Sequence, residues 1–146
     1  MTGTVFILLI LFGIKHFIAD FVLQYEYMLR EKGTYGAEGG IHHSAIHAAL
    51  TLLILVFFAN SANDIIVLAL ADGVIHYHVD WAKQQLNRGL TTADRMFWVW
   101  MGADQGLHYL TYIGIIYGVA YTKIMRIQRY MRQCRYLRRT NYAING

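Results

Sequence analysis

The chain has 146 residues, of which 56% are hydrophobic and none is proline, and its formal net charge is +4. This length excludes two domains of ordinary size, and the composition is typical of a helical membrane protein rather than a soluble one. The single cysteine, Cys134, excludes an internal disulfide.

Four apolar segments predict four membrane-spanning helices. The first begins without the basic region of a secretory signal, so we expect it to be retained as a span. Its polar second half must face protein, water or an ion. The predicted fold is therefore an all-α, integral-membrane four-helix bundle that runs up-down-up-down, with spans at about 4–24, 41–59, 64–81 and 97–121.

Polar stretches connect the predicted spans. Residues 25–40 are charged and then glycine-rich, which indicates a loop. A tight link at 60–63 offers Asn63 as the cap of the next helix. The connection at 83–96 predicts a partly interfacial helix, with Thr91 or Thr92 as the cap of the fourth span and with Lys83 and Arg95 at lipid headgroups.

An arginine-rich segment lies beyond the last span. Arginine recurs there at every third position, which winds around a helix instead of forming one stripe. We expect a bundle at 1–122 and a basic helical extension at 123–146, and the positive charge places both termini in the cytoplasm. We interpret the arginines of the tail first as a topology signal, and the alternative is a surface for anionic headgroups or nucleic acid; they are Arg126, Arg129, Arg132, Arg135, Arg138 and Arg139.

Each span carries one pair of potential metal ligands four residues apart, and that spacing puts both side chains on one helix face. The pairs fall late in the first and third spans and early in the second and fourth. In an up-down-up-down bundle these positions share one end, which the topology puts toward the periplasmic face. The predicted metal ligands are His16, Asp20, His43, His47, His76, Asp80, Asp104 and His108.

Five histidines and three aspartates suit two divalent ions better than one, with Zn²⁺ favoured and Mn²⁺ or Fe²⁺ possible. The spans contain no glutamate, which disfavours a di-iron bundle site. Asp72, four residues before His76, is expected to orient that histidine. Gln24, Gln105 and Lys15 are expected to bind the polar group of a substrate. His42 and His78 lie off the ligand faces.

Several of these blocks carry a resemblance. The blocks KHFIADFVLQ at 15–24, HHSAIH at 42–47, DGVIHYHVD at 72–80 and DQGLH at 104–108 resemble a family of small bacterial and phage integral-membrane proteins, catalogued as a domain of unknown function. The resemblance covers nearly the whole membrane part, with the arginine-rich tail outside it. More loosely, the chain is similar to inner-membrane metal-dependent hydrolases, which also present His and Asp from membrane helices.

These features favour a metal-dependent hydrolase of the bacterial inner membrane that acts on a lipid or a lipid-linked phosphate or ester. Two alternatives remain open. One is a non-enzymatic membrane protein that binds a protein partner and holds a structural metal or a hydrogen-bonded His/Asp cluster. The other is an ion or proton conduit. Membrane lipids are the expected partners, and Gly114 with Gly118 could join two copies of the chain.

Overall fold

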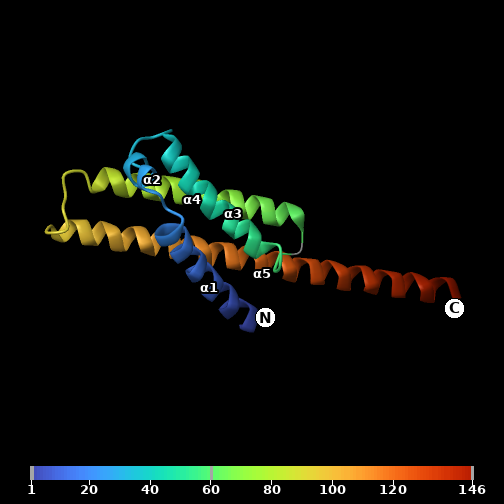
Figure 1. The fold of residues 1–146 in the computed structure, drawn as a ribbon. Helices are drawn as coiled ribbons and strands as arrows, with labels where there is room; N and C mark the ends of the chain where they lie inside the picture. The colour runs from blue at the N-terminus through green and yellow to red at the C-terminus, as the bar shows by residue number, and fades with distance from the viewer. Residues whose placement is uncertain (1, 60, 146) are drawn as a thin grey trace.

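The computed structural model describes residues 2–59 and 61–145, and the side chains of residues 3–59 and 61–137. In this part of the chain every element is helical (Figure 1): α1 Thr2–Phe17, the π-helical turn η1 Ile18–Val22, α2 Glu26–Glu31, α3 Glu38–Leu55, α4 Ala62–Leu86 and α5 Arg95–Asn145. The prediction of an all-α fold is confirmed.

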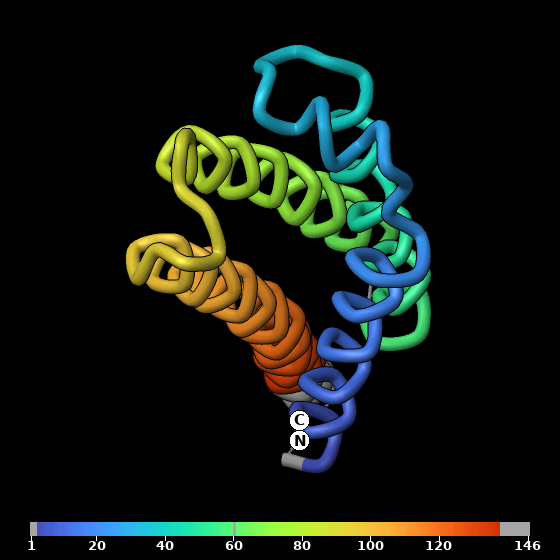
Figure 2. Tube along the Cα trace, turned by 60° about the vertical axis from the view of Figure 1, so that its left-hand side comes forward, coloured from blue at the N-terminus to red at the C-terminus, as the bar shows by residue number. Residues whose placement is uncertain are grey.

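The four long helices form a ring. α3 packs against α4 and α4 against α5, while α1 contacts both α3 and α5 and so closes the ring. Successive long helices run in opposite directions, as the traces in Figures 1 and 2 show. The end of α1, the start of α3, the end of α4 and the start of α5 therefore lie at the same end of the molecule.

The segment 25–40 has the composition of a loop, but it contains a helix of its own. α2 buries Met28, and α3 already begins at Glu38. The two helices approach closely at Gly39, where a Cβ would lie 2.9 Å from Met28 Cα and from Tyr27 O. A glycine that looks like a loop signal in the sequence is thus required for helix packing.

Gly39→Ala is expected to lower the free energy of unfolding by about 1–3 kcal/mol, because the added methyl group would meet backbone atoms that cannot move aside cheaply. Gly102→Ala in α5 is the matched control, since a Cβ there meets nothing within 4 Å. This control should be neutral or stabilising by up to about 1 kcal/mol. Thermal unfolding in detergent measures both effects, and equal midpoints for the two variants would contradict the packing argument.

The link between α3 and α4 differs from the prediction at its cap. Ser61 is the N-cap of α4, because its side chain accepts a hydrogen bond from the Asp64 N–H at 3.1 Å. The prediction of Asn63 as the cap is wrong, and Asn63 lies inside the helix. Asn60, also part of the predicted link, lies outside the described residues.

The connection between α4 and α5 is shorter than expected, because α4 continues to Leu86. Residues 87–94, all of them described, form turns in place of the predicted interfacial helix, and Gly89 adopts a positive φ of 76° there. The Thr91 N–H and hydroxyl both donate to Asp94 Oδ2, at 2.7 and 2.9 Å. These hydrogen bonds hold the pKa of the Asp94 carboxyl below its usual value and close the turn before α5.

α5 is a single helix of 51 residues that extends well beyond the bundle (Figure 1). It passes through the predicted boundary at residues 122 and 123 without a break, and every side chain from 125 to 137 is exposed. The basic segment is thus a straight continuation of the last bundle helix. The side chains of Arg138 and Arg139 lie outside the described residues.

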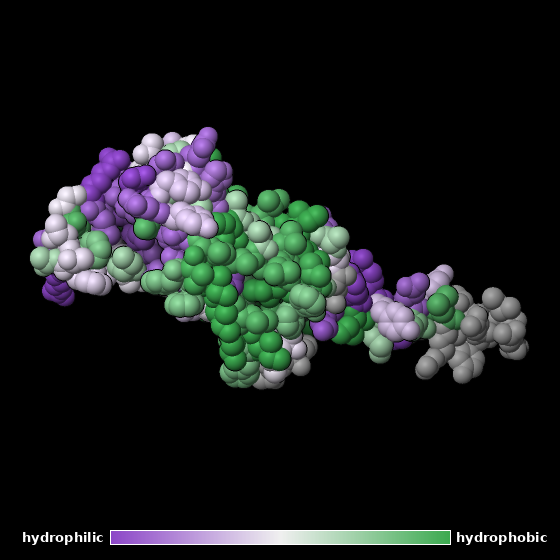
Figure 3. Space-filling model, viewed as in Figure 1, coloured by the Kyte–Doolittle hydropathy of each residue, from purple (hydrophilic) through white to green (hydrophobic). Residues whose placement is uncertain are grey.

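Over much of the molecule, polar and apolar side chains are distributed in the opposite way to those of a soluble protein. Many large apolar side chains face outward and form the green belt in Figure 3, while charged side chains such as Lys15 and Asp72 are buried. Two helices, at Gly3–Val22 and Ala62–Leu86, are long and apolar enough to cross a membrane, where four spans were predicted. We call the end of the bundle where α1 finishes and α3 begins the polar end. The apolar core fills only the opposite half of the bundle, and consists of Leu8, Phe12, Leu55, Tyr112, Ile115, Ile116 and Val119.

Candidate metal centre

The eight side chains predicted as metal ligands meet at the polar end of the bundle. They come in pairs from the end of α1 with η1, from the start of α3, from the second half of α4 and from the start of α5. All are buried except Asp20, whose side chain is 16% exposed. The alternating helix directions explain this meeting. The pairs lie late in the first and third long helices and early in the second and fourth, and these helix ends all lie at the same end of the bundle.

Asp20 lies in the π-helical turn η1 and not in a regular α-helix. Single π turns inserted in α-helices are frequent at functional sites. Asp20 Oδ1 lies 2.9 Å from His47 Nε2 and 3.4 Å from His43 Nε2, while Oδ2 lies 3.2 Å from His16 Nε2. This carboxylate therefore links the end of the first helix to α3.

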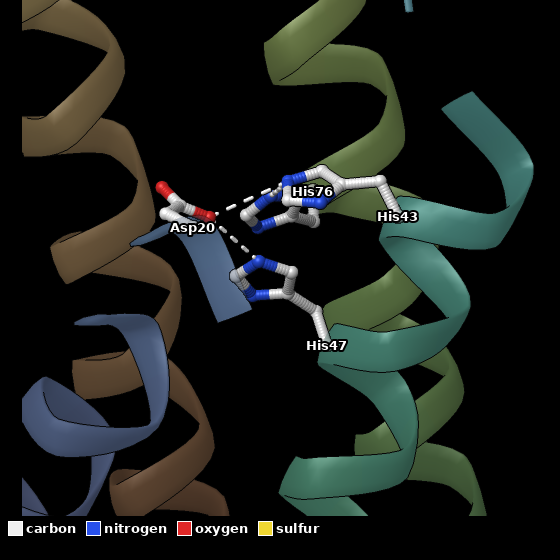
Figure 4. Close-up of side chains that lie close together, drawn as sticks. All are labelled: Asp20, His43, His47 and His76. Carbon is white, nitrogen blue, oxygen red and sulfur yellow. Dashed lines mark hydrogen bonds and ion pairs between the residues drawn. The ribbon is translucent and has the colours of Figure 1, made fainter. Parts of the chain in front are cut away.

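Asp20, His43, His47 and His76 form the first of two groups that could hold a metal ion, with ligand atoms within 4.8 Å of one another. Figure 4 shows the three histidine rings gathered beside the Asp20 carboxylate. The Nε2 atoms of His43 and His76 lie 3.2 Å apart. Two nitrogen ligands of a tetrahedral zinc ion, each at about 2.0–2.1 Å from it, lie about 3.3 Å apart, so this separation suits a single ion.

His76, Asp80 and His108 form the second group. Asp80 Oδ2 lies 3.3 Å from His43 Nε2 and 3.6 Å from His76 Nε2, while Oδ1 lies 3.7 Å from His108 Nε2. Asp104 belongs to neither group but lies next to this one, with Oδ1 3.4 Å from His108 Nε2. The two groups share His76, and the Asp80 carboxylate has one oxygen toward each of them.

His16 belongs to neither group, although its ring lies among the other histidines. Its Nδ1 lies 2.8 Å from the Tyr112 hydroxyl and its Nε2 lies 2.9 Å from Gln105 Oε1. Both ring nitrogens thus have hydrogen-bond partners. His16 therefore contacts two residues of α5 as well as Asp20 Oδ2, which lies 3.2 Å from its Nε2, but it is not part of either ligand group.

Several buried polar atoms of the cluster have no hydrogen-bond partner among the residues described. Such atoms are normally paired, because leaving one unpaired costs about 1–3 kcal/mol. The open atoms are His43 Nδ1, His47 Nδ1, His76 Nδ1, His108 Nε2 and Asp104 Oδ1. An ion could take up the open atoms of His108 and Asp104, whereas an ion bound through Nε2 of the other three histidines leaves their Nδ1 atoms unpaired.

A buried ion pair lies next to the cluster, toward the apolar core. Lys15 Nζ donates to Asp72 Oδ2 at 2.6 Å, and Thr51 Oγ1 donates to the same oxygen at 2.6 Å. The sequence predicted that Asp72 orients His76, but within the described chain His76 Nδ1 has no hydrogen-bond partner, so that prediction is wrong. The Lys15 ammonium, expected to bind substrate, is engaged by this pair and by the Tyr112 hydroxyl at 3.4 Å.

The two glutamines predicted to bind substrate lie at the edge of the cluster, half-buried. Gln24 Nε2 donates to the Asp20 carbonyl oxygen at 3.3 Å, and Gln105 Nε2 donates to Asp104 Oδ2 at 3.0 Å. Each glutamine is therefore in direct contact with a predicted metal ligand, and its contact with a substrate stays a prediction.

Two lysines of the site were not found from the sequence. Lys32 Nζ donates to Asp80 Oδ2 at 3.1 Å, and Lys83 Nζ lies 3.5 Å from Asp104 Oδ2. The prediction that Lys83 contacts headgroups is wrong, since its side chain points into the cluster. The sequence could have predicted the position of Lys83, because Lys83 follows Asp80 by three residues and so shares its helix face. No sequence pattern predicted the position of Lys32, because its segment has the composition of a loop.

The two remaining histidines lie outside the cluster, as their positions on the helices predicted. His42 Nδ1 lies 3.1 Å from the Tyr27 hydroxyl, and His78 Nε2 lies 3.2 Å from the Tyr35 hydroxyl. Both histidines are exposed. They offer neighbouring controls for experiments on the buried ones.

A family model described as "Protein of unknown function (DUF3307)" matches residues 6–137. This match covers nearly all of the chain, so the chain belongs to that family. The match includes the arginines of α5 as far as Arg135, so the expectation that the tail lies outside the resemblance is wrong. No curated protein and no solved structure matches the chain.

Proposed function

We propose that this member of the family is a membrane-embedded hydrolase that uses two divalent metal ions to cleave a lipid or a lipid-linked phosphate or ester. Mixed imidazole and carboxylate ligands favour Zn²⁺, with Mn²⁺ or Fe²⁺ as the next choices. The observation that carries the proposal is the spacing of the ligand atoms. The Nε2 atoms of His43 and His76 face each other at 3.2 Å, about the separation that one tetrahedral ion requires.

The two adjoining groups support a pair of ions rather than one. The Nε2 atom of a histidine has one lone pair, so His76 can serve only one ion through it. Asp80 has its Oδ2 beside the first group and its Oδ1 beside the second, as a bridging carboxylate does. Asp104 and His108 would complete the second site, and Asp20, His43 and His47 the first.

Divalent ions held by these residues would activate a water as the nucleophile and would offset negative charge that develops in the transition state. In the hydrolysis, the water oxygen bonds to the phosphorus or the carbonyl carbon, the ester bond breaks, and the leaving oxygen takes up a proton. Asp20 marks the accessible edge of the site, because it is the most exposed of the ligands. Gln24 lies beside Asp20 and Gln105 beside Asp104, and we expect both amides to hold polar oxygens of the substrate.

Membrane insertion of all four long helices is part of this proposal. Exposed apolar side chains cover the middle of the face that Figure 3 shows, and exposed patches of this kind mark contact with protein or membrane. The polar end then lies at one membrane face and the basic part of α5 beyond the other. The positive-inside rule puts that basic part and both termini in the cytoplasm of a bacterium, and the site toward the periplasm.

Elemental analysis of the detergent-purified protein tests the proposal. The parent is expected to hold close to two equivalents of zinc or manganese, and a His76→Ala, Asp104→Ala double variant is expected to lose them. A screen of phospholipid and lipid-phosphate substrates is then made with the loaded parent. A folded, monodisperse parent that holds no stoichiometric metal after purification without chelator would overturn the proposal.

The same preparation separates catalysis from a purely structural metal, the second candidate. The seven ligand residues offer eight donor atoms if both oxygens of Asp80 are used, which suffices to close two tetrahedral ions, and closed sites are structural. The half-exposed glutamines and the accessible Asp20 favour an open site instead. A structural metal predicts that chelation unfolds the bundle with no turnover to lose. An ion or proton conduit is disfavoured, because apolar side chains such as Phe12 and Leu55 fill the other half of the bundle.

The partners of the exposed surfaces also remain proposals. Membrane lipids would cover the apolar belt, and anionic headgroups or nucleic acid would bind the arginines of α5. Pairing of two chains through Gly114 and Gly118 is disfavoured at the second glycine. A Cβ at Gly118 would lie 3.3 Å from Leu68 Cδ2, so this glycine already packs against α4 of its own chain.

A further inference from the structure

Two lysines at the polar end are buried beside the carboxylates of the site. The Lys32 side chain is 6% exposed and the Lys83 side chain 10%. A buried ammonium group destabilises the fold unless close partners replace the water that it loses. Lys32 has such partners in Asp80 Oδ2 and Gln24 Oε1, each at 3.1 Å.

Lys83 lacks close partners of this kind. Its Nζ lies 3.5 Å from Asp104 Oδ2 and 3.9 Å from Asp80 Oδ1, both longer than an ordinary charged hydrogen bond of about 2.7–2.9 Å. An ammonium group has three N–H donors. Lys83 therefore has donors left over, and Lys32, which uses two of its three, has one. Both ammonium groups flank the single carboxylate of Asp80, on opposite oxygens.

With the histidines counted as neutral, two bound divalent ions would change the sign of the net charge of the site. The charged side chains here are four aspartates and three lysines, which leave one net negative charge: Asp20, Asp72, Asp80, Asp104, Lys15, Lys32 and Lys83. Two divalent ions would bring this to three net positive charges. A site of that charge, closed off from water on most sides, attracts an anion much more strongly than a neutral ester.

We propose that Lys32 and Lys83 form an anion-binding pair at the outer edge of the metal centre, and that it selects a phosphomonoester as the substrate. This inference rests on the proposed hydrolase and narrows its substrate class. The phosphate would accept hydrogen bonds from the N–H donors that Lys32 and Lys83 do not give to Asp80, next to the ions. Hydrolysis adds water across the P–O bond and releases an alcohol and inorganic phosphate, so the released phosphate is itself a ligand of the same pair.

Calorimetric titration of the metal-loaded, detergent-solubilised protein with inorganic phosphate tests the proposal. The parent is expected to bind phosphate, and the metal-free protein is not. Lys83→Gln and Lys32→Gln should each weaken binding at least about tenfold while metal content is retained, because ammonium groups do not ligate metal. Arg88→Gln is the matched control, since Arg88 is an exposed basic residue in the turn between α4 and α5.

A lysine that only neutralises Asp80 would give a different result. Lys32→Gln would then unfold the protein or release metal, and Lys83→Gln would leave phosphate affinity unchanged. Either that pattern or a loaded parent that binds no phosphate overturns the inference while the hydrolase proposal stands. If the parent protein holds no metal, both the hydrolase proposal and this inference are overturned. Mixed micelles of phosphatidic acid identify the source of the phosphate, because tighter binding than inorganic phosphate indicates a lipid and equal binding a water-soluble ester.

Discussion

His43→Ala is expected to remove bound metal from the protein, whereas His42→Ala, at the adjacent position, leaves it in place. His43 Nε2 lies within 3.4 Å of His76 Nε2, Asp20 Oδ1 and Asp80 Oδ2, so its loss removes a ligand that contacts members of both groups. Loss of residues that merely support ligands costs about 10–100-fold in metal affinity, and loss of a ligand should cost more. His42 is exposed and contacts Tyr27 instead.

Competition with a chromophoric chelator measures the affinity of each variant, and circular dichroism shows whether each one folds. The expected result is a drop of more than about 100-fold for His43→Ala, with no change for His42→Ala. Equal metal affinities for the two variants would mean that the cluster of histidines and aspartates is not a metal centre. Loss of folding in His43→Ala alone, without metal in the parent, would point to a hydrogen-bonded core.

The second large effect is expected at the buried pair of Lys15 and Asp72. Their side chains are 2% and 1% exposed and lie 2.6 Å apart. Removing one partner leaves an uncompensated charge in the interior, which costs about 3–5 kcal/mol, whereas replacing both by apolar residues is often neutral. Lys15→Met is therefore expected to destabilise severely, and Lys15→Met combined with Asp72→Leu should recover much of the lost free energy of unfolding.

Denaturant unfolding in detergent measures the free energy of unfolding of the parent, the single variant and the double variant. Recovery in the double variant is limited by Thr51, whose hydroxyl loses its acceptor when Asp72 is replaced. If Lys15 served as a substrate-binding group, Lys15→Met would instead spare stability and affect only turnover. A single variant as stable as the parent would thus contradict the structural role assigned to this pair.

The sequence predicted the meeting of the ligands because that meeting depends on two regularities only. Residues four apart share a helix face, and alternating helices bring the ends of odd and the starts of even segments together. His43 with His47 and His76 with Asp80 obey both regularities. The roles of single residues were less predictable, since hydrogen bonds depend on rotamers and on neighbours distant in sequence. Asp72 sits one turn from His76 yet bonds to Lys15, which is 57 positions away.

Local irregularities were also beyond the reach of periodicity. The π-helical turn around Asp20 contains no glycine or proline that would indicate an irregularity, so the hydrophobic periodicity predicted a regular helix there. α2 is only six residues long and is held by packing, with Gly39 allowing close approach. Short helices have little intrinsic stability, so tertiary contacts decide whether they form. The same reasoning explains why the position of Lys32 beside Asp80, just after α2, could not be predicted from the sequence.

The continuity of α5 has a mechanical consequence. A helix of 51 residues is about 77 Å long, more than twice the thickness of a hydrocarbon core of about 30 Å. Asp104 and His108 lie near one end of this rod, and the arginines lie toward the other. The helix contains no proline, and its last glycine before the exposed segment is Gly118. A torque applied to the projecting end would thus be transmitted along the rigid helix, and would turn Asp104 and His108 relative to the other five proposed ligands.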